Sequence, residues 1–233
     1  MSKKKNWAIP PCPGNPEDYT LVRPKNEPPY WRKKRGTVKP AKLNTSFKNN
    51  VKLNKNVSSM ASSIKKKIMP FLEKLETGRF VAKVSGRLRK EYYKSGKFNF
   101  GGLKEYELQP TYSLSNLLRR EYDVHVKGNE AIIEIPLGEN AVKKFNGLVT
   151  GYFFEGILLH GDLSKPNSLR VDSETSPVYD IRLKQATNCR LSLHLPTKKV
   201  SWMVMLKLHL VMGTKTGDFH KHFGMKVVWA EES

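Results

Sequence analysis

The sequence predicts a mainly β protein, an antiparallel β-sandwich preceded by a basic helical hairpin and an extended N-terminal arm. Three observations lead to this prediction: prolines crowd the first forty residues, two segments then show helical periodicity, and strand-like runs recur to the end of the chain. We therefore expect an arm over 1–56, a helical segment over 57–97 and a sandwich domain over 98–233.

The arm is expected to be extended, because proline fixes φ and cannot donate a backbone hydrogen bond. Its prolines stand at positions 10, 11, 13, 16, 24, 28, 29 and 40. Two aromatic residues, Tyr30 and Trp31, run directly into a basic cluster of Arg32, Lys33, Lys34 and Arg35. Such aromatics can stack on bases while the cations contact phosphates. The alternative is a solvated tail without fixed structure.

Two helices are predicted next, over Val57–Glu76 and Arg79–Tyr93. In the first, apolar residues recur at helical spacing at Val57, Met60, Ala61, Ile64, Ile68, Phe71, Leu72 and Leu75. Pro70 predicts a kink or a break into two short helices near Met69. A basic amphipathic pair of this kind can cover the β domain, lie on an anionic membrane or bind nucleic acid. Packing on the β domain is favoured, because an apolar stripe usually marks a buried face.

The prediction of a β domain rests on eight strand-like runs. They are Leu103–Gln109, Tyr122–Val126, Ala131–Pro136, Leu148–His160, Val178–Lys184, Arg190–Leu195, Val200–Met212 and Gly224–Ala230. Lys127, Gly128 and Asn129 form a compact turn signal between two of them. Because no helical segment separates the runs, an antiparallel sandwich is favoured over a parallel α/β sheet.

The longest run, Val200–Met212, alternates apolar residues with a second set that includes Lys207 and His209. One face is therefore predicted to be core and the other to be outward, which would place His209 on the surface. Arg190–Leu195 alternates in the same way and would place His194 outward. We expect these two runs to pair as an antiparallel hairpin.

Net charge is distributed very unevenly along the chain. Residues 1–100 hold 25 Lys and Arg against 6 Asp and Glu, whereas residues 101–233 hold 17 against 15. A cationic segment gains free energy by displacing counterions from a polyanion, which favours a nucleic-acid partner, although a solubilising face is the alternative. The predicted phosphate contacts are Arg32, Lys33, Lys34, Arg35, Lys65, Lys66, Lys67, Arg87, Arg89 and Lys90, with Tyr30 and Trp31 stacking on bases.

The sequence contains no convincing catalytic or cofactor motif. The chain has no G-x-S-x-G, no catalytic cysteine signature and no phosphate-binding glycine loop, so we expect neither an enzyme nor a cofactor. Asp218, His220 and His222 are two residues apart and could point the same way as ligands of a divalent metal. A polar hairpin tip is the favoured interpretation of this segment, so no metal is expected.

Cellular location is predicted from the cysteines and the hydropathy. Cys12 and Cys189 form a poor disulfide framework, and no apolar stretch reaches the ~18 residues of a membrane span. We expect a cytoplasmic protein, or a component of a particle assembled inside the cell.

A family resemblance rests on Phe98, Phe100, Gly102, the segment 114–118, the hairpin 122–136 and the closing strands 200–212 and 224–229. In these features the chain resembles small β-sandwich proteins of Bacteroidota-type bacteria that have a basic helical front. The resemblance covers residues 47–229 and implies a fold arrangement, but it supplies no functional residue.

The sequence thus predicts a noncatalytic nucleic-acid-binding protein with weak sequence selectivity. One alternative is a structural subunit of a particle or appendage, whose arm binds packaged nucleic acid or neighbouring protein subunits. The other is a small-ligand or carbohydrate-binding sandwich, for which Tyr152, Phe153 and Phe154 are candidates, although core positions are favoured for them.

Overall fold

The computed structural model describes residues 7–24, 27–34, 45–143, 148–197 and 199–231. The chain divides into two compact units, Met1–Asn50 and Val51–Ser233. Each unit is described separately below.

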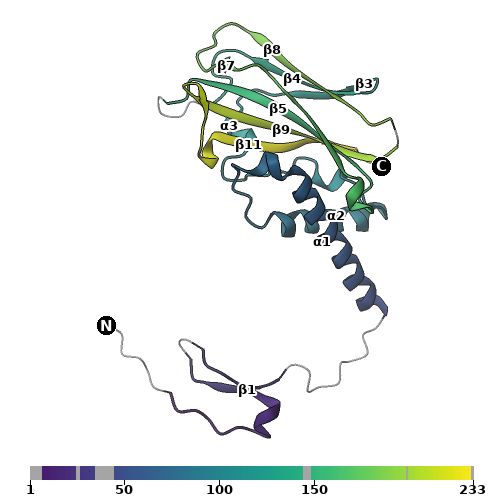
Figure 1. Cartoon of the computed structure of the whole chain (residues 1–233), viewed down its shortest axis with the longest axis vertical. Helices are drawn as coiled ribbons and strands as arrows, with labels where there is room; N and C mark the ends of the chain where they lie inside the picture. Colours follow the sequence, from purple (N-terminus) through teal and green to yellow (C-terminus); the bar gives the residue numbers. More distant parts are fainter. Residues whose placement is uncertain (1–6, 25–26, 35–44, 144–147, 198, 232–233) are drawn as a thin grey trace. The chain divides into compact units, whose positions relative to one another are not determined.

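The smaller unit contains a two-stranded antiparallel sheet (Figure 1). A single 3-10 turn, Pro16–Asp18, leads into β1 (Tyr19–Val22), which pairs with β2 (Tyr30–Lys33). The arm was predicted to be extended over residues 1–56. Most of its described part up to Lys34 is extended, and two of its segments pair with each other, but residues 45–56 are helical. Pairing is compatible with the prolines here because these lie outside the two strands.

Helix α1 spans Thr45–Leu72, with residues 51–72 in the larger unit, and begins twelve residues before the predicted start at Val57. Most of residues 45–56 are polar and exposed, and their three apolar residues, Phe47, Val51 and Leu53, are too few to predict a helix. Pro70 does not divide the helix into two, contrary to the prediction of a break. Proline at this position removes only the hydrogen bond to the Lys66 carbonyl, and the helix ends two residues later at Leu72.

The second helix, α2, spans Phe80–Ser95 and turns its apolar residues Phe80, Val84 and Leu88 inward. It ends at Gly96, which has φ of 73° and donates its N–H to the Tyr92 carbonyl at 2.8 Å. Glycine is favoured at this position because other side chains are strained in the left-handed region. No described helix has the length and apolar character required to cross a bilayer.

The β domain consists of two antiparallel sheets. In the larger sheet the strands run β10–β9–β5–β6, with β11 also paired to β9 and β7 to β5; the bounds are β5 Gly151–Gly161, β6 Arg170–Thr175, β7 Tyr179–Asp180, β9 Ser201–Met212, β10 Lys215–Thr216 and β11 Phe223–Ala230. The smaller sheet has the order β3–β4–β8, with bounds β3 Asp123–Lys127, β4 Glu130–Leu137 and β8 Thr187–His194. The predicted antiparallel β-rich fold is thereby confirmed.

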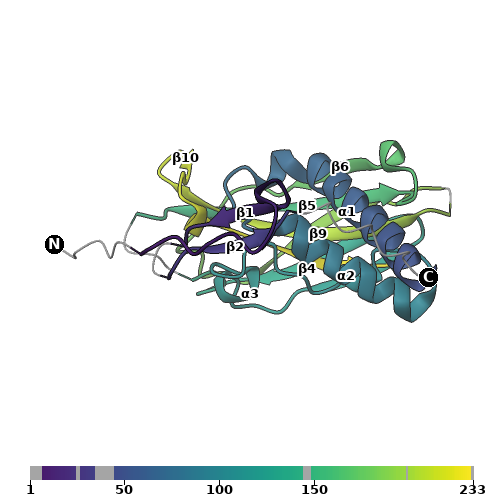
Figure 2. The same ribbon diagram turned by 90° about the horizontal axis from the view of Figure 1, so that it is seen from below.

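Three layers result, with the larger sheet in the middle (Figure 1). Helices α1 and α2 lie side by side across one face of this sheet, as Figure 2 shows from below. The smaller sheet covers the opposite face. The helices therefore share a core with β5, β9 and β11, and the predicted packing of the helices on the β domain is confirmed.

Strand β9 contributes to both cores. Its even-numbered residues Val204, Leu206, Leu208 and Leu210 pack between the sheets, and Met203 and Met205 pack against the helices. The prediction of one outward face on this strand was wrong, because the helices cover that face. His209 was accordingly predicted to be a surface residue but is 8% exposed, and Lys207 is 5% exposed.

Several predicted strands differ in the structure. β8 and β9 do not form a hairpin, because β8 pairs with β4 and β9 pairs with β5 and β11. The chain therefore crosses from one sheet to the other between them. The segment 103–109 contributes a single bridge, from Glu107 to Lys226, and the segment 178–184 keeps only β7 as strand. Strand β6 was not predicted, because its exposed polar residues show little apolar alternation.

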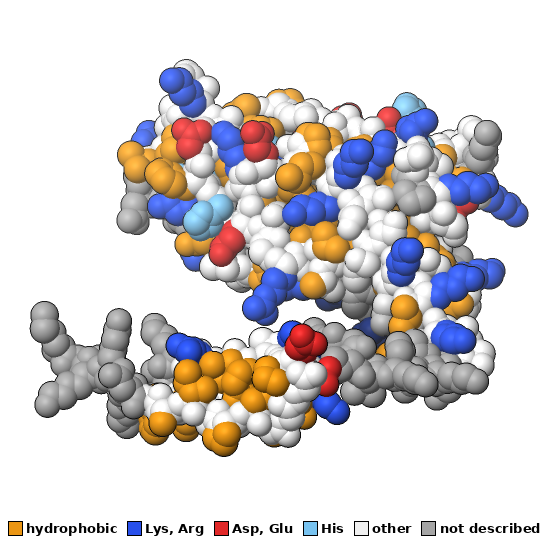
Figure 3. Space-filling view, turned by 60° about the horizontal axis from the view of Figure 1, so that its bottom comes forward, with side chains coloured by type: hydrophobic (Ala, Val, Ile, Leu, Met, Phe, Trp, Pro, Cys, Tyr) orange, Lys and Arg blue, Asp and Glu red, His pale blue; other side chains and the backbone are white. Residues whose placement is uncertain are grey.

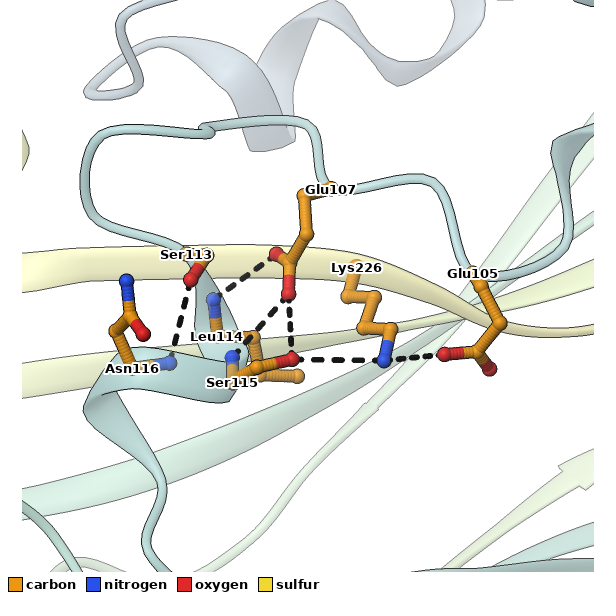
Figure 4. Close-up of polar contacts among 7 residues, drawn as sticks. All are labelled: Glu105, Glu107, Ser113, Leu114, Ser115, Asn116 and Lys226. Atoms are coloured by element: carbon orange, nitrogen blue, oxygen red, sulfur yellow. Dashed lines mark hydrogen bonds and ion pairs between the residues drawn. The ribbon is translucent and has the colours of Figure 1, made fainter.

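A polar network attaches the segment between α2 and β3 to β11 (Figure 4). The Glu107 carboxylate accepts hydrogen bonds from the backbone N–H groups of Leu114 and Ser115, at 3.0 and 3.2 Å. These two groups begin the short helix α3 (Leu114–Leu117), whose first amides have no partner inside the helix. Lys226 of β11 forms an ion pair with Glu105 and donates to the Ser115 hydroxyl at 3.5 Å.

Candidate nucleic-acid interface

The two long helices carry many more cations than carboxylates. The α1 sequence contains six Lys and no Asp or Glu, and α2 contains five Lys and Arg and one Glu. Within the residues that the structure describes, none of these eleven cations forms a salt bridge. Like charges three or four residues apart repel on a helix, so the repulsion persists until an anion binds.

Four of the cations lie along one face of α2, and we name them the α2 basic stripe: Lys83, Arg87, Lys90 and Lys94. Their spacing of four, three and four residues places them above one another on a helix. All four are exposed, and they line a groove of about 880 Å³ together with Tyr93, Glu91 and two glycines. In the space-filling view Lys and Arg side chains are spread over this side of the larger unit, and Asp and Glu are few (Figure 3).

Arg87 is the most constrained member of the stripe. Its Nη1 donates to the Gly102 carbonyl at 3.3 Å, and its guanidinium lies 4.9 Å from the centre of the Tyr106 ring. Burial raises the pKa of Tyr106, and the nearby guanidinium opposes that rise. A Cβ at Gly102 would come within 2.9 Å of both the Arg87 carbonyl oxygen and the Glu91 Cβ, so only glycine allows this approach.

The structure separates the cations that the sequence predicted on the helices. Arg87 and Lys90 belong to the stripe, but Arg89 turns toward α1 and donates to the Asn54 side chain at 3.1 Å. The run of lysines on α1 divides into an exposed Lys66 and the half-buried pair Lys65 and Lys67.

Lys83 and Lys94 were missed by the prediction. They are single lysines outside the dense basic runs on which the prediction concentrated. The helical spacing that joins them to Arg87 and Lys90 is present in the sequence and could have identified them.

The predicted residues of the arm lie in the smaller unit. Tyr30, Trp31, Arg32 and Lys33 form β2, where side chains alternate between the two faces of the sheet. The Trp31 indole donates to the Pro10 carbonyl at 2.7 Å, whereas Tyr30 is 46% exposed. Tyr30 is therefore the better placed of the two aromatics for stacking. Lys34 follows the strand and is exposed, and Arg35 lies outside the described residues.

The dimensions of the stripe suit a phosphate backbone. Eleven residues of α-helix rise by about 16 Å, so the stripe presents a cation at each turn over that length. Phosphates of one strand of duplex DNA are about 3.4 Å apart along the axis, so several lie within reach of the stripe. Such contacts position a nucleic acid without reading its sequence.

The low-priority metal ligands do not converge. His220–His222 is a 3-10 turn and not a strand, so the expected alternation of side chains is lost. Asp218 pairs with Lys74 at 3.1 Å, the His220 ring lies 5.3 Å from the Tyr112 ring, and His222 is 4% exposed. Among the described residues, no group of three His, Cys, Asp or Glu could hold a metal ion. The two cysteines, Cys12 and Cys189, are both free thiols.

Comparisons with known proteins add little to this description. Neither protein-family models nor curated proteins match the chain. A solved structure, the solution structure of R. palustris CsgH, aligns with 47% of this chain and 90% of its own length at 8% identity and a TM-score of 0.24. A TM-score this low carries no argument about fold or function.

Proposed function

We propose that this protein is a noncatalytic nucleic-acid-binding protein, and that the α2 basic stripe contacts the phosphate backbone. The observation that carries the proposal is the set of eleven helical cations without a carboxylate partner in the described structure. Neutralising them with phosphates releases condensed counterions and relieves their mutual repulsion.

The alternative of a solubilising face accounts less well for the pattern. Solubility is served by surfaces on which charges of both signs are interspersed, whereas the two helices carry one acidic residue between them. Tyr93 adds a 64% exposed ring at the edge of the groove. An aromatic ring beside cations is the combination that single-stranded nucleic acid contacts by stacking.

The test uses three substitutions in the stripe, Lys83→Gln, Lys90→Gln and Lys94→Gln, made together in the full chain. Binding of a fluorescent oligouridylate is measured by anisotropy as salt rises from about 50 to about 200 mM. The wild type makes four phosphate contacts through the stripe, so its affinity should fall about 50-fold over this range. The triple variant keeps only the Arg87 contact, so its affinity should fall about threefold.

A matched control removes three exposed lysines from the β domain, Lys127→Gln, Lys184→Gln and Lys215→Gln. This control changes the net charge by the same amount and should keep the steep salt dependence. Equal weakening by the two triple variants would show that net charge alone attracts the oligonucleotide, and the assignment to the stripe would be wrong.

A second candidate, a structural subunit of a larger assembly, is supported by the arm. The smaller unit has Trp7 and Ile9 before its two-stranded sheet and Tyr30 within it, all between 44% and 50% exposed. An isolated two-stranded sheet is marginally stable in water. A neighbouring protein that covered these side chains would stabilise the sheet. Light scattering tests this candidate: the full chain should form a defined oligomer, and Tyr30→Ser should dissociate it, whereas a monomeric wild type would exclude it.

A further inference from the structure

A polar cluster occupies the helix-facing side of the larger sheet where α1 ends. Strand pairing places Phe153, His209 and Phe223 in one row, and Glu155, Lys207 and Met225 in the next. Further along the same face the residues are apolar and packed against the helices. The change from apolar to ionisable residues therefore coincides with the end of the helical cover.

His209 is held rigidly in this cluster. Its Nε2 is 2.8 Å from the Glu155 carboxylate, its ring stacks on Phe153 at 4.2 Å, and it meets Phe223 edge-on at 5.3 Å. Burial lowers the pKa of His209, and the bond with Glu155 only partly opposes that shift. The Glu155 carboxylate is thus already engaged by a fixed partner within the protein.

Lys207 is in a different situation. The residue is 5% exposed, yet in the described structure its ammonium forms neither a hydrogen bond nor a salt bridge. Its ammonium lies 5.3 Å from the centre of the Phe223 ring, a cation–π distance. Burial lowers the pKa of Lys207, and the charges of Glu155 and Glu73 oppose this. A buried cation without an ion-pair partner is costly, and buried charges are normally paired.

The cluster lines a pocket of about 380 Å³. Its wall is the end of α1 and the turn after it, from Pro70 to Lys74, and Thr216 of β10 closes another side. Phe71, Phe153 and Phe223 supply apolar surface. A volume near the lower end of the ligand-binding range suits a small molecule and not a polymer.

We propose that this pocket binds a small organic anion, whose carboxylate or phosphate group pairs with Lys207 and whose apolar body lies against the three phenylalanines. An anion is favoured because Glu155 is bonded to His209 and Lys74 is paired with Asp218 at 3.1 Å, so Lys207 is the cation left to bind the ligand. Glu73, the other carboxylate of the lining, belongs to an exposed residue. A small cation would meet the Lys207 ammonium and be repelled.

The experiment uses benzoate as the probe and benzamide as its neutral counterpart, with calorimetric titration into the full chain. Benzoate should bind and benzamide should not. Lys207→Met keeps an unbranched side chain, one atom shorter, and removes its charge. It should weaken benzoate binding at least 10-fold, as expected for a charged hydrogen bond in a buried site. Lys215→Met, on the exposed neighbouring strand β10, is the control and should bind benzoate like the wild type.

The outcomes separate the possibilities. Equal affinity for benzoate and benzamide, or for the wild type and Lys207→Met, would overturn the proposal, as would the absence of benzoate and phenyl phosphate binding to the wild type. Tighter binding of phenyl phosphate than of benzoate would identify a phosphate as the preferred head group. The pocket is independent of the α2 basic stripe, so the triple stripe variant should bind benzoate unchanged.

Discussion

Replacing Lys207 by methionine should make the protein more stable. In the native state Lys207 is 5% exposed and its ammonium, at the pocket wall, has no ion pair in the described structure, so folding removes most of the side chain from water with little compensation. The cation–π contact with Phe223 returns roughly 1–2 kcal/mol of this cost. Replacing buried charges by apolar side chains of similar volume commonly stabilises by about 1–4 kcal/mol, and we expect about 2 kcal/mol here.

The pH dependence of this gain distinguishes the charge from the packing. Because the native pKa of Lys207 is below the unfolded value of 10.5, the unfolded chain binds more protons between these two values, and wild-type stability rises there with pH. The advantage of Lys207→Met should therefore be greatest below the native pKa and shrink as pH approaches 10.5.

Thermal unfolding followed by circular dichroism measures both effects. A gain of about 2 kcal/mol corresponds to a Tm increase of roughly 4–8 °C for a unit of this size. A variant that is less stable than the wild type at pH 7, or whose advantage is the same at pH 7 and pH 10, would refute the argument that the buried charge costs stability.

Three further predictions concern the larger unit. Gly86→Ala should raise the free energy of unfolding by about 0.5–1 kcal/mol, because nothing lies within 4 Å of the new Cβ at this exposed helical position. Gly102→Ala should lower the free energy of unfolding by about 2 kcal/mol, because the new Cβ clashes with α2. Urea unfolding of the two variants checks both signs. Glu107→Ala removes the acceptor of the first α3 amides and should cost about 2 kcal/mol in the same assay, while Ser113→Ala, which removes one cap, should cost about 1 kcal/mol. A fragment of residues 101–233 should lack a cooperative thermal transition and bind a hydrophobic dye, because without α1 and α2 it exposes one face of the larger sheet; a cooperative transition like that of the full chain would contradict the shared core.

The sequence predicted most helices and strands well, but it predicted poorly which strands pair and which faces are covered. Apolar periodicity correctly predicted both helices of the hairpin and the strands that face the core between the sheets. The β3–β4 turn was also correctly predicted, because Gly128 at φ of 61° is the residue type that such a turn requires. Apolar periodicity and turn residues depend only on neighbouring positions in the chain, so they can be recognised from the sequence.

Pairing and coverage could not be predicted in the same way. The alternation of β8 and β9 is the same whether they pair with each other or lie in different sheets, so the sequence could not exclude a hairpin. The second buried face of β9 depends on helices more than a hundred residues away. Among the candidate site residues, the charge asymmetry correctly indicated the helices as cationic, but the turning of Arg89 toward Asn54 depends on helix packing.

The alternation of side chains along β9 determines which residues enter each core and which line the pocket. Even-numbered residues face the smaller sheet and odd-numbered residues face the helices, so insertion of one residue before Val204 would exchange the two sets. Lys207 and His209 would then lie between the two sheets, and leucines would line the pocket. A change in the length of this strand would therefore alter both cores and the pocket at once, whereas a single substitution alters one of them.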